Sequence, residues 1–276
     1  MKITVLPALV LLSSAAAFAQ TPAPAQIPSD VKNDIQIDIQ SPIKTESAVA
    51  VADEPHHAHV FQNSYVRVYD VTVPPLDATL LHRHDLPYIY LMLGAADIVN
   101  EVEGKPAARL VLEDGAARYS PGDFTHLVRT DAGIPFHNIT VALVHPQASL
   151  HNLGDKGDDR LLGSCPQNSA APAQNDQIPF EQALPCFETS EVHMDEVKVQ
   201  GGKDFLQASP ETAALLIAMS NANLDVSLGG QHAAFLHVGD VLWLPTGLAR
   251  KVGDFLGSGS RFLLISFKDS GAAPSK

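Results

Sequence analysis

The stretch His82-Arg83-His84, followed downstream by Gly115 and by Pro121-Gly122-Asp123-Phe124-Thr125-His126, holds most of the information on fold and function. In a β-strand, residues i and i+2 point to the same face, so both imidazoles of the pair point the same way. A third imidazole from a later strand, that of His126, would complete a set of three nitrogen ligands for a divalent metal. Three protein ligands leave positions open for water or a substrate. The alternative is a surface pair, since H-x-H is common in strands.

Short strand-like runs of residues follow one another through the first half of the chain, and the first of them alternates cleanly between apolar and polar residues. The clearest run is Tyr65–Val73, which ends at Pro74-Pro75. Further runs cover residues 79–82, 88–93, 97–102, 108–112, 117–119, 124–128 and 136–144. Many short strands at close spacing, without a convincing amphipathic helix, predict an all-β sandwich or barrel.

The second half of the chain repeats landmarks of the first at a constant offset of 124 residues. The four pairs are Gly115 and Gly239, Pro121 and Pro245, His126 and Arg250, and His137 and Arg261. A shared offset indicates a duplicated domain, with coincidence among common residue types as the alternative. At the same offset the three motif histidines are replaced by Leu206, Ala208 and Arg250. We therefore predict one metal site, in the first copy only.

The amino-terminal region has the features of an exported protein. Residues 1–19 combine Lys2, an apolar run and the cleavage pattern Ala17-Phe18-Ala19, which predicts a secretory signal peptide; an uncleaved anchor is the alternative. Residues 20–50 are expected to be extended or mobile, although Ile35–Ile39 alternates like a strand. We expect a periplasmic or secreted protein that leaves the membrane once the signal is cleaved.

Charge and cysteine content narrow the partners and the compartment. The formal net charge of −13 argues against binding of nucleic acid or anionic membranes. The chain has two cysteines, Cys165 and Cys186, which we expect to form a disulfide in an oxidising compartment. Two unrelated buried thiols are the alternative. Both lie in residues 148–187, a polar and proline-containing segment that we interpret as an interdomain linker.

The two histidine motifs resemble those of the cupins. The first cupin motif, G-x5-H-x-H-x3-4-E-x6-G, is matched at His82-Arg83-His84 and approximately at Gly94. The second, G-x5-P-x-G-x2-H-x3-N, is matched at Gly115, Pro121 and His126. The resemblance implies two cupin-type β-barrels of the jelly-roll kind in tandem.

The resemblance extends over residues 61–144 and, more weakly, 192–267. It implies an N-terminal cupin barrel at residues 51–147 and a degenerate C-terminal barrel at 188–270. Tyr88 stands where the family has its glutamate ligand, Asp123 replaces a glycine, and Thr130 replaces the terminal asparagine. The three histidine ligands therefore carry over, and the carboxylate ligand does not.

Neutral imidazoles suit one divalent transition metal: iron, manganese, nickel, copper or zinc. The resemblance and the ligand set suggest a metal-dependent dioxygenase or isomerase that acts on a small oxygenated organic molecule. The alternatives are a non-catalytic periplasmic module that binds metal or a small ligand, and a structural bicupin without metal. Cupin barrels often associate through sheet edges, so a homodimer is a further option.

Other candidate residues are assigned by position. Tyr88 is expected to donate a hydrogen bond into the ligand cavity or simply to fill the barrel, and His137 to line the cavity or to serve the structure. No catalytic residue is assigned beyond Tyr88 as a group behind the ligands. Three histidines before the first strand, His56, His57 and His59, are interpreted as solvated, with transient metal binding as the alternative.

Overall fold

The structure is a computed structural model of the 276-residue chain. It describes residues 47–153, 161–165, 181–199, 204–206, 212–222, 224–228, 235–246, 250–254 and 260–268. The predicted signal peptide and the alternating segment Ile35–Ile39 lie outside the described residues. The other strand predictions in the first half of the chain fall within them.

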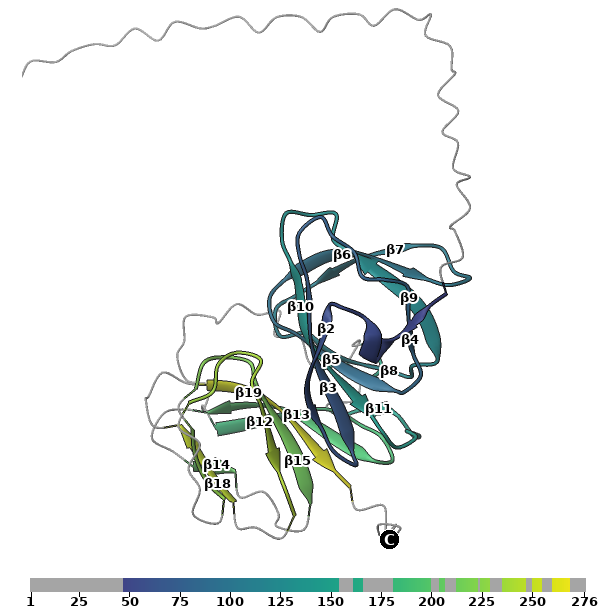
Figure 1. The fold of residues 1–276 in the computed structure, drawn as a ribbon. Coiled ribbons are helices and arrows are strands. Elements are labelled where there is room, and N and C mark those ends of the chain that lie inside the picture. The colour runs from purple at the N-terminus through teal and green to yellow at the C-terminus, as the bar shows by residue number, and fades with distance from the viewer. Residues whose placement is uncertain are drawn as a thin grey trace, which may run out of the picture. The chain divides into compact units, whose positions relative to one another are not determined.

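The first barrel is built from ten strands and one short 3-10 helix, η1 (Val51–Asp53). The strands are β1 (Val49–Ala50), β2 (His57–Gln62), β3 (Val66–Val73), β4 (His82–His84), β5 (Tyr88–Met92), β6 (Ala96–Val102), β7 (Ala108–Leu112), β8 (Ala117–Ser120), β9 (Phe124–Arg129) and β10 (Phe136–Leu143). They form two five-stranded sheets with the orders β1-β4-β9-β6-β7 and β2-β3-β10-β5-β8. Figure 1 shows these strands enclosing a barrel.

The second barrel contains the remaining described strands. They are β11 (His151–Asn152), β12 (Glu181–Glu188), β13 (Val192–Val199), β14 (Asp204–Leu206), β15 (Ala213–Ala218), β16 (Leu224–Leu228), β17 (Val241–Leu244), β18 (Arg250–Asp254) and β19 (Ser260–Phe267). A six-stranded sheet has the order β11-β12-β13-β19-β15-β17, and a three-stranded sheet has the order β14-β18-β16. The fold is therefore all-β, with two jelly-roll barrels in tandem.

Strands extend into two segments for which the sequence predicted irregular structure. β1 ends the segment 20–50, and β11 and β12 lie in the predicted linker 148–187. β12 escapes a pattern-based prediction because Pro185 interrupts its alternation, and a proline in a strand usually marks an edge or a bulge. The structure resolves the conflict with a register shift between Pro185 and Phe187.

The predicted repeat is visible in the strands themselves. β17 and β19 begin 124 residues after β8 and β10, at Val241 against Ala117 and at Ser260 against Phe136. The order β2-β3-β10-β5-β8 in one sheet recurs as β12-β13-β19-β15-β17 in the other. The repeated glycines also share a conformation, because Gly115 and Gly239 have φ values of 74° and 90°, in the region that favours glycine.

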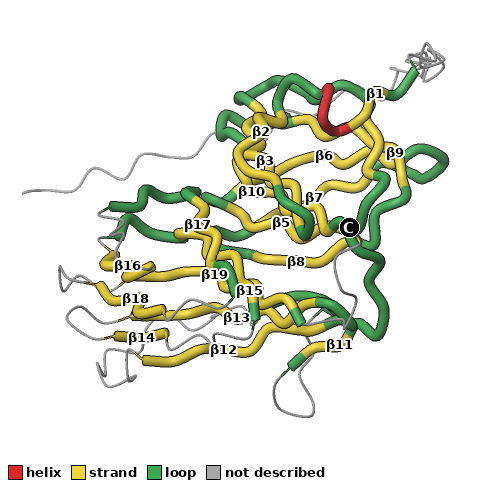
Figure 2. Tube along the Cα trace, turned by 60° about the horizontal axis from the view of Figure 1, so that its bottom comes forward, coloured by secondary structure: helices red, strands yellow, loops and turns green. Residues whose placement is uncertain are grey.

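The sheet β2-β3-β10-β5-β8 and the six-stranded sheet of the second barrel lie side by side (Figure 2). The hydrophobic core between them contains residues of both barrels. In β10, Ile139, Val141 and Leu143 face this core, whereas Asn138 and Thr140 face the interior of the first barrel. β10 is therefore covered on both faces, which explains why nearly all of its residues are buried. Burial on two faces also explains why apolar residues occur on both faces of β10 rather than in a strict alternation.

The disulfide lies in this shared core. Cys165 and Cys186 are joined in the structure and are 5% and 0% exposed. An aromatic group packs nearby, in which Tyr65 from the first barrel contacts Trp243 and Phe267 from the second. Trp243 is partly buried and packs against this core.

Candidate metal centre

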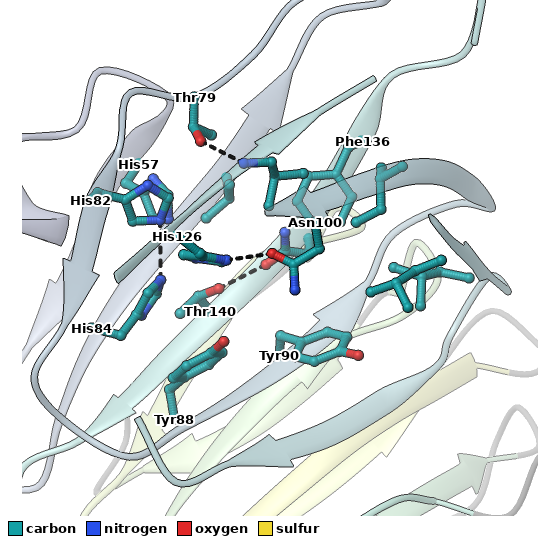
Figure 3. Close-up of a pocket in the computed structure, with 16 residues that line it drawn as sticks. His57, Thr79, His82, His84, Tyr88, Tyr90, Asn100, His126, Phe136 and Thr140 are labelled. Atoms are coloured by element: carbon teal, nitrogen blue, oxygen red, sulfur yellow. Dashed lines mark hydrogen bonds between the residues drawn. The ribbon is translucent and has the colours of Figure 1, made fainter. Parts of the chain in front are cut away.

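Paired strands place the three motif histidines together at the inner wall of the first barrel. β4 and β9 are antiparallel, with His82 directly opposite His126. The ring centroids of His82 and His126 lie 4.5 Å apart, and those of His84 lie 5.1 Å from each of the other two. All three side chains are buried, at 1%, 4% and 7% exposure for His82, His84 and His126. Figure 3 shows the rings converging.

Hydrogen bonds fix which ring nitrogen points inward. His82 donates from Nδ1 to the Leu80 carbonyl oxygen at 2.8 Å, and His126 donates from Nδ1 to Asn100 Oδ1 at 2.8 Å. In a neutral imidazole the other nitrogen, Nε2, then carries the lone pair that a metal requires. The Nε2 atoms of His82 and His84 lie 3.2 Å apart. His126 Nε2 is buried and has no hydrogen-bond partner among the described residues.

A fourth imidazole, that of His57, belongs to the same cluster. The interpretation of His57 as solvated is wrong, because the residue is 8% exposed. One ligand atom from each of His57, His82 and His84 lies within 4.8 Å of the other two. His59, two residues further along β2, is exposed as expected. In the sequence, the signal for His57 is an acidic residue three positions earlier, Glu54. A single acidic residue is not a recognisable motif, so this signal does not predict a site.

Burial keeps the motif histidines neutral. It lowers the pKa of His82 to about 4, with the hydrogen bond to Leu80 as a partial offset. Burial and then the neighbouring imidazoles lower the pKa of His84 to about 2 and of His126 to about 3. Neutral rings at pH 7 are the form that can bind a metal.

The cluster opens into a cavity of about 110 Å³ inside the first barrel. Apolar side chains form one part of its lining: Val71, Ile98, Leu110, Leu112, Val128 and Phe136. Beside the histidines, its polar lining comes from Thr79, Tyr88, Tyr90, Asn100, Asn138 and Thr140. No carboxylate, lysine or arginine is among the described residues that line it.

In the described part of the second barrel, two positions that match polar cavity residues of the first are apolar. At the 124-residue offset, Asn138 and Thr140 of β10 correspond to Phe262 and Leu264 of β19, which are buried in an apolar cluster. At these two described positions, hydrophobic side chains stand where the first barrel has polar residues that line its cavity.

Tyr88 and His137 fall on opposite faces of their sheet. Tyr88 lines the cavity, and its ring stacks on His84 at a centroid distance of 4.4 Å. Burial raises the pKa of Tyr88 to about 12, despite a hydrogen bond with Ser120. His137 alternates with the inward residues of β10, so it points away from the barrel interior, and its Nε2 lies 2.8 Å from Asp70 Oδ1. The cavity role considered for His137 is thus wrong, and its structural role holds.

Two departures from the cupin motifs have local structural explanations. Asp123 stands in place of a glycine and has a φ of 58°, a conformation that aspartate tolerates better than most residues. Its amide donates to the His84 carbonyl at 2.6 Å, which ties the turn to β4. Thr130 stands in place of an asparagine and donates from its hydroxyl to the Pro74 carbonyl at 2.6 Å.

Within the described residues, no helix is long and apolar enough to cross a membrane. No family model matches the sequence, and no curated protein matches it.

Similarity to known proteins is found in structure. AerE from Microcystis aeruginosa superposes with a TM-score of 0.54 at 10% identity, over 78% of this chain and 98% of AerE. A salicylate 1,2-dioxygenase from Pseudaminobacter salicylatoxidans superposes with a TM-score of 0.51 at 12% identity, over 75% and 71% of the two chains. A variant of such a dioxygenase in complex with gentisate gives a TM-score of 0.53 at 12% identity, over 74% and 69%. These neighbours have the cupin fold, and so does this protein, with two barrels in tandem.

Proposed function

We propose that the protein is an exported cupin that binds one divalent metal through His82, His84 and His126 and acts on a small oxygenated organic molecule. The observation that carries the proposal is the convergence of three buried imidazoles, two of which, His82 and His126, have their outer nitrogens already hydrogen-bonded. His126 Nε2 in particular is buried without a partner, and such an atom is costly unless something binds it.

The spacing of His82 and His84 fits two ligands of one metal, and these two belong with His57 to a group of mutually close ligand atoms that does not include His126. Two nitrogens that each lie about 2.1 Å from one ion, at roughly a right angle, are about 3 Å apart. The separation of 3.2 Å between His82 Nε2 and His84 Nε2 agrees with this. Because all ligands are neutral, the ion would keep its full charge, which favours an anionic oxygen in the open positions. The candidate metals are iron, manganese, nickel, copper and zinc.

A bound metal would supply a centre that polarises a carbonyl or enolate oxygen, or that lowers the pKa of bound water. The protein's own groups then hold the reactants. The Leu80 carbonyl and Asn100 keep protons on the outer nitrogens of His82 and His126. Asn138 and Thr140 offer hydrogen bonds to the oxygens of a ligand, and the apolar wall around Phe136 excludes water.

The size and lining of the cavity support a small substrate that places at most about one ring inside it. A cavity of about 150 Å³ in another protein holds benzene, and this one measures about 110 Å³. The described residues that line it include no lysine, arginine or carboxylate, so an anionic ligand would be balanced by the metal rather than by a lysine or arginine. A compact, largely apolar molecule with one or two oxygens near the metal meets both conditions.

Two reactions are in view for such a site, dioxygenation and isomerisation. A structural neighbour is a salicylate 1,2-dioxygenase, which makes dioxygenation the first to test. A non-catalytic metal- or ligand-binding module is the second candidate function. It is favoured by the absence of a carboxylate or lysine from the described cavity lining and by the raised pKa of Tyr88, which leave no general base except the histidines.

The test begins with elemental analysis of protein that was purified without a polyhistidine tag. We expect one metal per chain, lost in the double variant His82→Ala/His84→Ala and retained in the control His59→Ala. Oxygen consumption is then measured with enolisable diketones and hydroxylated aromatic acids. Metal-dependent uptake supports the dioxygenase, and metal without turnover supports the binding module. A protein that takes up no metal and melts unchanged in chelator contradicts the proposal.

A further inference from the structure

We propose that His57 is a fourth nitrogen ligand of the metal and that Glu54 is the carboxylate behind the site, which orients both His57 and His82. The inference rests on the proposed function, because it requires a metal to be bound. It assigns roles to two residues that lie outside both histidine motifs.

Hydrogen bonding to Glu54 leaves one ring nitrogen of His57 available to a metal. Its Nδ1 donates to Glu54 Oε2 at 2.6 Å, and a carboxylate can only accept, so the proton is on Nδ1. Nε2 is then the atom that carries the lone pair. The ring centroid lies 4.8 Å from that of His82 and 5.9 Å from that of His84. A buried imidazole held by a carboxylate on its outer nitrogen is the arrangement common to metal-binding histidines.

Glu54 is buried at 2% exposure, and both of its oxygens are occupied. Oε2 accepts from the backbone amide of His56 at 2.8 Å as well as from His57. Oε1 accepts from His56 Nδ1 at 3.0 Å and from the Leu80 amide at 3.1 Å. To bind a metal directly, the carboxylate would have to give up these bonds, so we assign it to the layer behind the ligands.

The Leu80 peptide extends the reach of Glu54 to a second ligand. Its amide donates to Glu54, and its carbonyl accepts from His82 Nδ1. One buried carboxylate thus holds His57 directly and His82 through a single peptide group. The cupin glutamate ligand is absent here, and Glu54 keeps a negative charge near the ion without entering its coordination sphere.

A fourth ligand from β2 also joins the two sheets of the barrel. β2 belongs to one sheet, whereas β4 and β9, which bear His82, His84 and His126, belong to the other. A metal held by all four imidazoles would cross-link the sheets, and part of its stabilising effect on the fold would pass through His57.

The experiment uses full-length, tag-free protein and the variants His57→Ala, His57→Asn and Glu54→Gln, with His59→Ala as the matched control on the same strand. Zinc affinity is measured by competition with a chromophoric chelator. Cobalt(II) absorption spectra report the number of ligands, and melting curves with and without zinc report the cross-link. His57→Asn keeps a donor for Glu54, so it separates loss of the ligand from misfolding if His57→Ala does not fold.

We expect both His57 variants to bind zinc at least about 100-fold more weakly, to change the cobalt spectrum and to lose part of the zinc-induced rise in melting temperature. Glu54→Gln should weaken zinc binding by about 10–100-fold and leave the cobalt spectrum of the four-nitrogen site in place. His59→Ala should match the wild type. Wild-type affinity and spectra in folded His57→Asn overturn this inference and leave the three-histidine site intact. Absence of metal from the wild type overturns the proposed function itself.

Discussion

The metal-free protein should lose stability steeply in mild acid, because its buried histidines resist protonation in the folded state. The pKa values of His82, His126 and His84 lie at about 4, 3 and 2, against 6.5 for an imidazole in water. At pH 5 the unfolded chain therefore binds about three protons that the folded chain does not. Since the unfolded state binds more protons, the free energy of unfolding falls as the pH falls below 6.5.

The size of the effect follows from the same values. The value pH 5 lies about 1.5 pH units below the pKa of 6.5 in the unfolded chain, and one pH unit corresponds to about 1.4 kcal/mol. Each ring therefore lowers the free energy of unfolding by about 2 kcal/mol. Three rings cost about 6 kcal/mol, which is a large part of a typical stability of about 5–15 kcal/mol. Glu54, whose pKa is raised by burial but brought down to about 2 by its hydrogen bonds, adds a further loss only as the pH falls below 4.5.

Urea unfolding of chelator-treated protein at pH 7, 6 and 5, followed by circular dichroism, measures this loss. The variant His84→Asn removes one titrating ring and should reduce the loss between pH 7 and pH 5 by about a third. The control His59→Ala should leave it unchanged, because that residue is exposed. A free energy of unfolding at pH 5 within about 1 kcal/mol of the value at pH 7 would refute the reasoning.

Three further predictions concern the scaffold. Replacing Cys165 and Cys186 with serine removes a disulfide that closes a sequence separation of 21 residues, and should cost about 3 kcal/mol in urea unfolding; alkylation of two thiols without prior reduction would contradict the disulfide. Ile139→Ala, at 1% exposure in the core between the barrels, should cost about 2–5 kcal/mol, whereas Val111→Ala, at 74% exposure, should cost less than about 0.5 kcal/mol; equal effects would argue against the shared core. Gly122→Ala should lower stability by more than about 1 kcal/mol in thermal unfolding, since φ is +70° and the new Cβ would lie 2.2 Å from a backbone oxygen, and a neutral result would contradict that turn geometry.

Much of the fold could be predicted because its signals are local. Short strand-like runs predicted strands close to β5, β7 and β10. The glycine landmarks at 115 and 239 revealed the duplication, because both turns need a positive φ. β12 was missed, since Pro185 broke the pattern and only tertiary pairing with β13 and a bulge restore the strand. Local pattern reading has no access to such pairing.

The site was predictable only where spacing within one strand or motif determines it. His82 and His84 share a face by their separation of two, and His126 is reached through its motif. His57 is brought to them by the closure of the barrel, which places β2 of one sheet near β4 of the other. The face of the sheet on which His137 lies could not be decided from sequence. Both faces of β10 are buried, so the pattern of apolar residues gives no sign of which side chains point into the barrel.

The double coverage of β10 has a consequence for how this chain can evolve. Alternate side chains of this strand have two different roles. Asn138 and Thr140 line the cavity, while Ile139 and Val141 pack against the second barrel. The carboxy-terminal copy, which has Leu206, Ala208 and Arg250 at the positions of the three motif histidines, therefore still packs against a strand that lines the cavity. In evolution, substitutions in its six-stranded sheet would reach the cavity through Ile139 and Val141 before they changed either barrel as a whole.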